Sequence, residues 1–534
     1  MKGLLKKLFR VVAVLLLVLL LAVLGLFGWL YARSGGPYPD YAVDLVKPAP
    51  GAAVTPDPQF KVGVAMRDIT PDLTQYDKFV DKNGNNKYEP AKGDYFEDTN
   101  GNGKLDAVWI AGFGNNRPAQ GVHDPLWARA IAFENNGVRV VLVTVDSIGL
   151  FAEKIINIRK RLDPALNIDH LVVSCLHDHE APDTMGIWSV GLERPFWRFD
   201  YGYMDLLQQS VADAAAEAVG NLRPAEAFMA ETAVGPEGFM DDSRIPLVYD
   251  NVIRIARFVD PGTDNTIATM VNWGNHPETV GSRNPLLTSD FSHYWREGVE
   301  KGVAEPLGAP GVGGMCLYFQ GQVGGLMTQL HTTVPHRNGV DKFREDSFEK
   351  AEALGDNLAL ATLRAIREGS RPMETATVAV AAKTFMVPVG NKLFSFAAFV
   401  GLVHPGWWKG HVRSEVNALR VGDLEILTIP GEIYPEICEG GVEAPEGRDF
   451  PIQPVEVPPL RAQMKGKTTM ILGLANDELG YMVPKSQWDV KPPFAYGRDS
   501  DQYGEENSFG PDVPGAVHKA SMEVLASLHK ALGE

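Results

Sequence analysis

The longest apolar stretch of the chain lies near its N-terminus, where the twenty residues from Val11 to Leu30 carry no charge. A helix rises 1.5 Å per residue, so this stretch spans about 30 Å, the thickness of the hydrocarbon core of a bilayer. Four basic side chains precede it and only Arg33 follows closely, which predicts a cytoplasmic N-terminus. We interpret residues 1–34 as a basic segment and a transmembrane signal anchor.

Everything beyond the anchor is then extracytoplasmic, in the cell envelope or periplasm or at the cell surface. A cleaved signal peptide is the alternative, and the protein would then be secreted; however, Tyr31 to Ser34 form a poor cleavage site. Residues 35–58 are rich in Pro, Gly and Ala, which indicates a tether. Residues 59–534 remain for the folded part of the chain.

The next informative pattern is a strand, a helix and a strand within about forty residues. Val138 to Val145 is a continuous β-branched run, Glu153 to Leu162 has helical spacing, and His170 to Ser174 is a second apolar run. This order predicts a βαβ unit with parallel strands. Ligands of such sheets gather at the carboxyl ends of the strands, so we expect Asp146 and His177 to be neighbours.

Four further strand patterns also end in polar, Gly- or Pro-rich turns, as suits a site built on loops above a rigid sheet. They are Thr266–Trp273, Met315–Phe319, Leu424–Ile429 and Thr468–Leu474. Helices are predicted at Met204–Val219, Phe348–Ile366 and Val517–Leu532. The pattern favours an α/β fold.

Composition narrows the classes of function. The chain is 45% hydrophobic and 22% charged, which is typical of globular proteins and ample for a large core. Its net charge of −17 argues against a nucleic-acid partner, because such proteins need a basic surface. The three cysteines are too few and too scattered for a disulfide framework, so we expect them to be buried beside strands.

Residues 81–106 contain two similar segments that resemble calcium loops. Each places oxygen-bearing side chains at positions 1, 3, 5 and 9: Asp81, Asn83, Asn85 and Glu89 in the first copy, and Asp98, Asn100, Asn102 and Asp106 in the second. Both copies lack the acidic residue at position 12 of an EF-hand. The alternative is a pair of Asn-Gly turns without an ion. We favour structural Ca²⁺.

Two histidines, His177 and His179, follow the second strand of the βαβ unit. Alternate residues of extended chain point the same way, so the pair could serve one metal ion or one reacting group. Taken alone, the pair is equally compatible with surface residues that have no such role.

Several motifs in order along the chain resemble the neutral (alkaline, non-lysosomal) ceramidase family. They are Gly63–Pro71, Arg129-Ala130, the strand ending in Asp146, His177–Pro182, Asn272-Trp273 with His276-Pro277, Ser289-Asp290, Pro430-Gly431-Glu432, Gly480-Tyr481 and Gln502-Tyr503. The resemblance implies a single large catalytic domain with mixed β-sheets flanked by helices. It also implies a catalytic Zn²⁺ held by four residues, His177, His276, Glu432 and Tyr481.

The resemblance further implies that His179 is a general acid/base or oxyanion partner and that Tyr503 is a second active-site tyrosine. Arg244 matches an arginine of the family more weakly. We expect Asp146 to orient a histidine rather than to bind the metal.

Three departures from the family pattern matter. Gly324 to Met327 stand where the family has Gly-Asp-x-Ser, so we do not expect a covalent serine mechanism. An insertion separates Tyr481 from Tyr503. The sequence ends without the immunoglobulin-like domain of longer members, so the hydrophobic pocket is expected to differ.

The sequence therefore predicts a membrane-anchored zinc amidohydrolase acting on the N-acyl amide bond of ceramide or a related N-acyl lipid, with sphingosine and fatty acid as the products from ceramide. One alternative is hydrolysis of another amide or ester by the same metal site. Another is a catalytically decayed, calcium-stabilised surface binding module.

Overall fold

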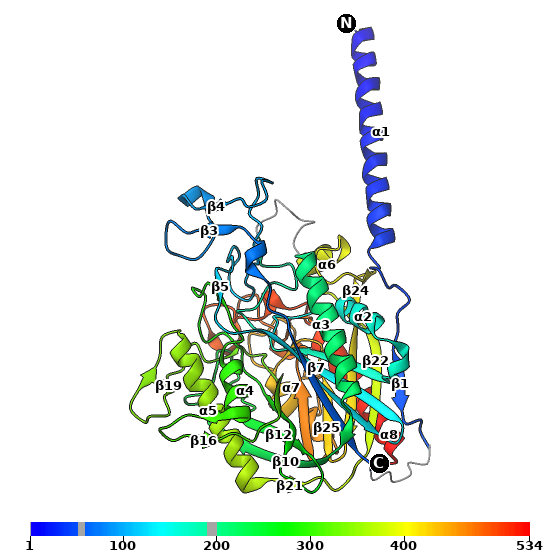
Figure 1. The fold of residues 1–534 in the computed structure, drawn as a ribbon. Coiled ribbons are helices and arrows are strands. Elements are labelled where there is room, and N and C mark those ends of the chain that lie inside the picture. The colour runs from blue at the N-terminus through cyan, green and yellow to red at the C-terminus, as the bar shows by residue number, and fades with distance from the viewer. Residues whose placement is uncertain (1, 52–58, 190–199) are drawn as a thin grey trace.

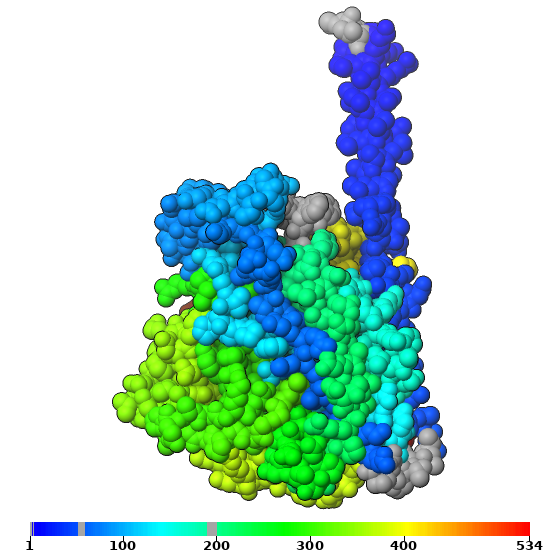
Figure 2. Space-filling model, viewed as in Figure 1, coloured from blue at the N-terminus to red at the C-terminus, as the bar shows by residue number. Residues whose placement is uncertain are grey.

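The computed structural model describes residues 2–51, 59–189 and 200–534 (Figure 1). Helix α1 (Lys2–Arg33) projects from the folded body, and Figure 2 shows it standing clear of the other side chains along most of its length. Among the described residues it is the one helix long and apolar enough to cross a membrane, with its apolar window entirely exposed. Such a helix suits an anchor or a signal sequence, as its composition predicts.

Three sheets form the body, and each has the same internal order. In each, a parallel pair of strands lies at one edge, and antiparallel partners follow across the sheet. The first sheet contains, in spatial order, β8 (His170–Cys175), β7 (Val138–Val145), β6 (Trp127–Asn135), β2 (Lys61–Asp68) and β9 (Arg223–Pro224). The second contains β17 (Met315–Gln320), β13 (Thr266–Trp273), β12 (Val252–Val259), β10 (Glu226–Ala233) and β21 (Arg371–Pro372). The third contains β27 (Thr468–Leu472), β25 (Leu424–Thr428), β24 (His411–Val421), β22 (Val378–Pro388) and β1 (Asp44–Lys47), with β23 (Trp407–Trp408) also paired to β24.

The three sheets share one central core, and helices cover their outer faces. Phe133, Phe258 and Leu419, one from each sheet, belong to the same buried cluster. The helices are α2 (Ala152–Arg161), α3 (Tyr201–Gly220), α4 (Phe291–Lys301), α5 (Phe348–Gly369) and α8 (Val513–Leu532). Helix α3 packs on the first sheet, α4 and α5 on the second, and α8 on the third. Burial on both faces explains why the strands are continuous apolar runs.

Most of the predicted elements are present with small shifts at their ends. Strands β7 and β13 begin and end at the predicted residues, and β7 pairs with β8 in parallel, as the βαβ pattern requires. Helix α3 includes Gly220, one residue beyond the predicted end at Val219. All three cysteines are buried and unpaired, also as predicted. The α/β fold with mixed sheets and flanking helices is thus confirmed.

The segment 35–51 is more ordered than a tether. Its residues Asp44–Lys47 form β1, which pairs antiparallel with β22 at the edge of the third sheet. Leu45 packs against the central core and Val46 against the core beneath α8. Because Leu45 and Val46 pack on opposite faces, they anchor the segment to the body. The Pro and Gly content of the sequence did not indicate this strand. Residues 52–58 lie outside the described part of the chain.

The two calcium-like segments flank strand β4 (Tyr95–Glu97), which pairs with β3 (Lys78–Val80). They form the same hydrogen bonds. Glu89 Oε2 accepts from the side-chain amides of Asn83 and Asn85 at 3.3 and 2.6 Å. In the second copy, Asp106 Oδ2 accepts from Asn100 and Asn102 at 2.7 and 2.6 Å. The two copies are therefore similar in structure as well as in sequence.

Candidate functional site

The candidate site lies where the parallel pairs of the three sheets meet. His177 follows β8 of the first sheet, His276 follows β13 of the second, and Glu432 follows β25 of the third. The sheets are linked at this point, because Cys175 N donates to Leu474 O at 3.0 Å and Gly473 N donates to Gln320 O at 3.0 Å. Each sheet thus delivers one side chain of a type that can ligate a metal to a common centre.

The two histidines are oriented by backbone carbonyls. His177 Nδ1 lies 2.8 Å from Ile148 O, and His276 Nδ1 lies 2.6 Å from Met327 O. These contacts place the hydrogen on Nδ1, leaving Nε2 of each ring with a lone pair. His177 adopts a φ of 61°, a conformation that non-glycine residues favour little outside turns and functional sites.

The Nε2 atoms of both rings point to one carboxylate oxygen. Glu432 Oε2 lies 3.4 Å from His177 Nε2 and 3.2 Å from His276 Nε2. With Nδ1 already donating, neither neutral ring has a hydrogen to offer this oxygen, so three electron-rich atoms converge. A cation between them would satisfy all three, which is what a metal site requires.

Tyr481 reaches the same centre from the neighbouring strand. Glu432 in β26 (Glu432–Ile433) pairs directly with Tyr481 in β28 (Tyr481–Met482), a short parallel ladder. The Tyr481 hydroxyl lies 3.3 Å from His276 Nε2. All four side chains named by the family resemblance are therefore brought together and buried.

The pKa shifts at the centre differ in direction: burial alone would lower the pKa of His276, but its contact with Glu432 and the charge of Glu278 outweigh it and raise that pKa. Burial lowers the pKa of His177, which favours the neutral ring that ligates metals. Burial alone would raise the pKa of Glu432, but its interactions with His177, His276 and Tyr481 outweigh it and hold that pKa below its ordinary value. Burial, with the charge of Glu432, raises the pKa of Tyr481.

His179 lies beside this centre. Its ring centroid is 4.9 Å from that of His177 and 5.3 Å from that of His276, and one ring nitrogen of each histidine lies within 4.8 Å of the others. These three buried histidines could hold a metal ion as a triad. Burial, followed by the neighbouring imidazoles, lowers the pKa of His179 well below its ordinary value.

A carboxylate that the sequence analysis missed faces His179. Glu278 Oε2 lies 3.2 Å from His179 Nδ1, and its other oxygen accepts a hydrogen bond from Thr328. Glu278 follows His276 by two residues, and this spacing is the feature of the sequence that could have indicated its place in the site. Gly112, at a φ of 92°, faces the other side of the ring, where a Cβ atom would lie 2.3 Å from a ring carbon of His179. Only glycine leaves room for the ring there.

Arg244 lies near the site and holds a neighbouring loop in place. Its guanidinium forms two hydrogen bonds with Glu505, at 2.7 and 2.6 Å, and donates to Tyr503 O at 2.9 Å. The Tyr503 ring centroid lies 5.6 Å from that of Tyr481, and its hydroxyl accepts from Asn507 at 2.7 Å. Arg244 thus fixes the segment that carries Tyr503, and Tyr503 borders the site as the resemblance implies.

Asp146 does not lie against a histidine. Its two oxygens accept from Arg296 at 2.6 and 2.9 Å, and Oδ2 also accepts from Trp127 N. The expectation that it orients a ligand therefore fails, because a buried arginine occupies both oxygens. The loop after β7 still supports His177, through the carbonyl of Ile148.

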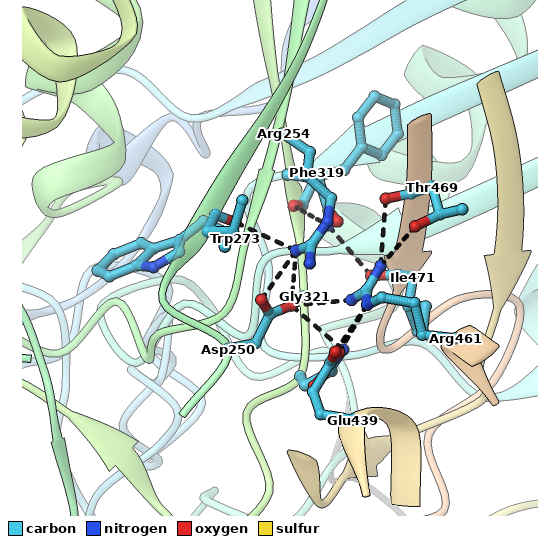
Figure 3. A network of polar contacts seen from close by, with 12 residues as sticks. Asp250, Arg254, Trp273, Phe319, Gly321, Glu439, Arg461, Thr469 and Ile471 are labelled. Atoms are coloured by element: carbon cyan, nitrogen blue, oxygen red, sulfur yellow. Dashed lines mark hydrogen bonds and ion pairs between the residues drawn. The ribbon is translucent and has the colours of Figure 1, made fainter. Parts of the chain in front are cut away.

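A polar network ties the second and third sheets together near the site (Figure 3). Asp250 accepts from Arg254 at 2.7 Å and from Arg461 at 2.9 Å, and Arg461 also donates to Glu439 at 2.7 Å. Gln322, in the loop after β17, donates to Glu439 at 2.7 Å. Glu439 ends α7 (Pro435–Glu439), the helix that follows Glu432, so the network holds the loops that carry the site.

The likeness to known proteins is structural. No protein-family model and no curated protein matches the chain. Among solved structures, it resembles a ceramidase complexed with C2, at a TM-score of 0.62 and 13% identity over 89% of this chain and 76% of that one. It also resembles neutral ceramidase from Pseudomonas aeruginosa, at a TM-score of 0.61 and 13% identity over 89% of this chain and 75% of that one. The chain therefore has the fold of neutral ceramidase, as the order of its motifs predicts.

Proposed function

We propose that the protein is a membrane-anchored, extracytoplasmic zinc amidohydrolase that cleaves the N-acyl amide bond of ceramide or a related N-acyl lipid. The observation that carries the proposal is the convergence of His177, His276 and Glu432, one from each sheet, in a fold shared with ceramidases. Two imidazoles and a carboxylate form a recognised hydrolytic zinc site, and the Tyr481 hydroxyl supplies a fourth ligand. When bound, zinc polarises a carbonyl and lowers the pKa of bound water to about 7.

His179 is the residue best placed to move protons beside the metal. It is adjacent to the ligands without sharing their contacts to Glu432, and Glu278 faces its Nδ1. With a hydrogen on Nδ1, the Nε2 lone pair of His179 would accept a proton from the attacking water and return it to the leaving amine. Tyr503, at the border of the site, is a hydrogen-bond donor to the substrate.

The segment 324–327 contains no serine nucleophile. Met327 stands at the serine position of the family pattern, and its buried thioether has no hydroxyl to attack a carbonyl. The nearby Thr328 hydroxyl is committed to Glu278. The carbonyl of Met327 holds His276 instead. This segment therefore supports a ligand rather than supplying a nucleophile.

The test combines metal analysis with a substrate panel. The purified full-length chain is expected to contain one zinc ion and to release fatty acid from ceramide faster than from other N-acyl lipids or from esters. Zinc with a different preferred amide or ester would correct the substrate. A chain without zinc or hydrolysis, but with specific binding to a surface partner, would overturn the proposal in favour of a binding module.

Replacing Glu278 with Gln is expected to lower kcat by about 10–100-fold while zinc and KM stay unchanged, because a partner of the proton-transferring histidine is weakened. Thr328→Val is the matched control: it removes a contact on the far oxygen of Glu278 and should have a smaller effect. Loss of zinc in Glu278→Gln would show instead that Glu278 acts on the metal. The measurements are steady-state kinetics and metal content.

We also propose that residues 81–106 bind structural Ca²⁺ through the two matched loops. Calcium at 100 times its dissociation constant would stabilise the loops by about 2.7 kcal/mol, so proteolysis that requires loop opening should slow about 100-fold. Asp81→Asn with Asp98→Asn should abolish this protection, and magnesium serves as the control ion. Unchanged cleavage and melting temperature with calcium would favour ion-free Asn-Gly turns.

A further inference from the structure

An apolar surface beside α1 has no role in the site described above. We define the α6 patch as Leu393 and Phe396, on helix α6 (Lys392–Phe399), and Trp408 in β23. Their exposed fractions are 72%, 60% and 50%. Three large apolar side chains gathered on one surface are unusual for a protein region that faces only water.

Helix α6 does not need these side chains for its own attachment. Asn391 caps the helix through Leu393 N and Phe394 N, and its amide donates to Ser508 O. On the inner face, the Phe394 ring stacks on Phe509 with centroids 5.2 Å apart. A rigidly held helix therefore presents Leu393 and Phe396 outward.

The patch adjoins the end of the helix that the sequence predicts to cross the membrane. The ring of Phe27 lies 5.4 Å from that of Phe399, and Tyr31 lies 6.3 Å from Trp408. Figure 1 shows α6 at the base of α1, and Figure 2 shows residues of this region against that base. Phe27 is three residues inside the predicted span, so these contacts lie within about 5 Å of its outer end. The patch is thus at the depth of the boundary between headgroups and acyl chains.

The charges around the patch suit the same boundary. Lys392 and Lys409 are exposed beside it, and Lys409 Nζ lies 5.5 Å from the centre of the Trp408 ring. Tryptophan and lysine together are typical of side chains at membrane interfaces, where the ring is half buried and the ammonium faces lipid phosphates.

Pockets lie on both sides of α6, one toward Tyr503 and one toward α1. One, of about 630 Å³, is lined by Asn391 at the start of α6 and by Tyr503 at the border of the site. Another, of about 350 Å³, lies between Phe27 of α1 and Phe396 and Trp407. The patch therefore stands between the proposed span and the proposed site.

We propose that the α6 patch inserts into the outer leaflet of the bilayer that α1 crosses and holds the body at a fixed depth, so that N-acyl lipid enters the site from that leaflet. The occupant of the patch is lipid at the headgroup boundary. The insertion rests on α1 being retained as an anchor, and the delivery of lipid rests on the proposed function.

Depth-dependent fluorescence quenching in the full-length chain tests the insertion. Leu393→Cys and Phe396→Cys are labelled with an environment-sensitive fluorophore, since the native cysteines are buried. The chain is placed in phosphatidylcholine nanodiscs with nitroxide lipids labelled near the headgroup. Val340→Cys is the control, because Val340 is 80% exposed between β19 (Val334–Pro335) and β20 (Lys342–Phe343), and Figure 1 shows β19 far from α1. We expect blue-shifted, quenched emission at the two α6 positions and neither effect at Val340.

Emission at the α6 positions equal to that at Val340 would overturn the insertion, and a water-exposed patch would then point to a protein partner. Because α1 holds every variant in the nanodisc, this readout depends on depth alone. A second measurement tests delivery: Leu393→Ser with Phe396→Ser should slow hydrolysis of ceramide in nanodiscs but not of a water-soluble short-chain amide. If no amide is hydrolysed by any variant, the proposed function fails while the quenching result stands.

Discussion

Alanine at His177 or at His276 is expected to remove the bound metal and reduce hydrolysis to background, whereas alanine at His179 should leave the metal bound and slow hydrolysis by about 10²–10⁴-fold. The reason is the direction of the rings. Nε2 of His177 and of His276 points at Glu432 Oε2, whereas His179 has no such contact and faces Glu278. Zinc per chain and kcat/KM measure the two effects separately.

This prediction decides between two metal sites that the geometry permits. The three histidines have ligand atoms close enough for a triad, which would make His179 a ligand and leave Glu432 outside. Loss of zinc in His179→Ala, with zinc retained in Glu432→Gln, would contradict the assignment made here and support the triad. His411→Ala, at an exposed histidine, is the control and should change neither readout.

The sequence predicted the site where polar residues follow apolar runs, because that relationship survives in the linear order of residues. The pattern around Val138–Val145 and His170–Ser174 gave both strands and their parallel pairing, and hence the place of His177. The gathering of His276, Glu432 and Tyr481 came from the family resemblance and is present in the geometry. Individual motifs would not have indicated it.

What the sequence could not show depends on backbone atoms and on packing between distant segments. The partners of the two histidine Nδ1 atoms are carbonyls of Ile148 and Met327, and a carbonyl is present at every residue whatever its side chain. The role predicted for Asp146 was wrong because of packing between distant segments. Its position after β7 was correct, but its partner Arg296 lies 150 residues away in sequence.

The common order of the three sheets was also invisible. No repeat is apparent in the residues, yet each sheet has a parallel pair at one edge followed by antiparallel strands. Apolar β-branched residues are interchangeable in a strand buried on both faces, so topology can recur without recurrence of sequence. This order explains why one of the three converging side chains, His177, His276 and Glu432, comes from each sheet.

A buried ion pair behind the site gives the largest expected effect on stability. Glu415 accepts from both terminal nitrogens of Arg159 at 2.7 Å, and also from Asn476 at 2.7 Å. Arg159 lies on α2, Glu415 on β24, and Asn476 in the loop between β27 and Tyr481, so the pair joins the first sheet to the third. Its side chains are only 14% and 5% exposed, which leaves little solvent screening.

Glu415→Gln is therefore expected to lower the free energy of unfolding by about 3–5 kcal/mol at neutral pH, because Arg159 is left buried without its counter-charge. Arg159→Met combined with Glu415→Gln should recover part of that loss, since it removes both charges. Urea midpoints of the full-length variants in one detergent measure these differences. A Glu415→Gln variant as stable as the wild type would contradict this prediction and show that water reaches Arg159.

The same pair predicts how the difference depends on pH. Burial raises the pKa of Glu415, but the charge of Arg159 outweighs it and holds that pKa far below its ordinary value of 4.5. A carboxylate with a depressed folded-state pKa stabilises fully above the pKa of the unfolded chain and loses that contribution as pH falls. The wild type should thus keep its full advantage over Glu415→Gln at pH 7 and lose it progressively below about pH 4.5, because the unfolded chain takes up a proton at Glu415 before the folded chain does. A difference that stays constant down to pH 3 would mean that the ion pair contributes nothing beyond shape and hydrogen bonding.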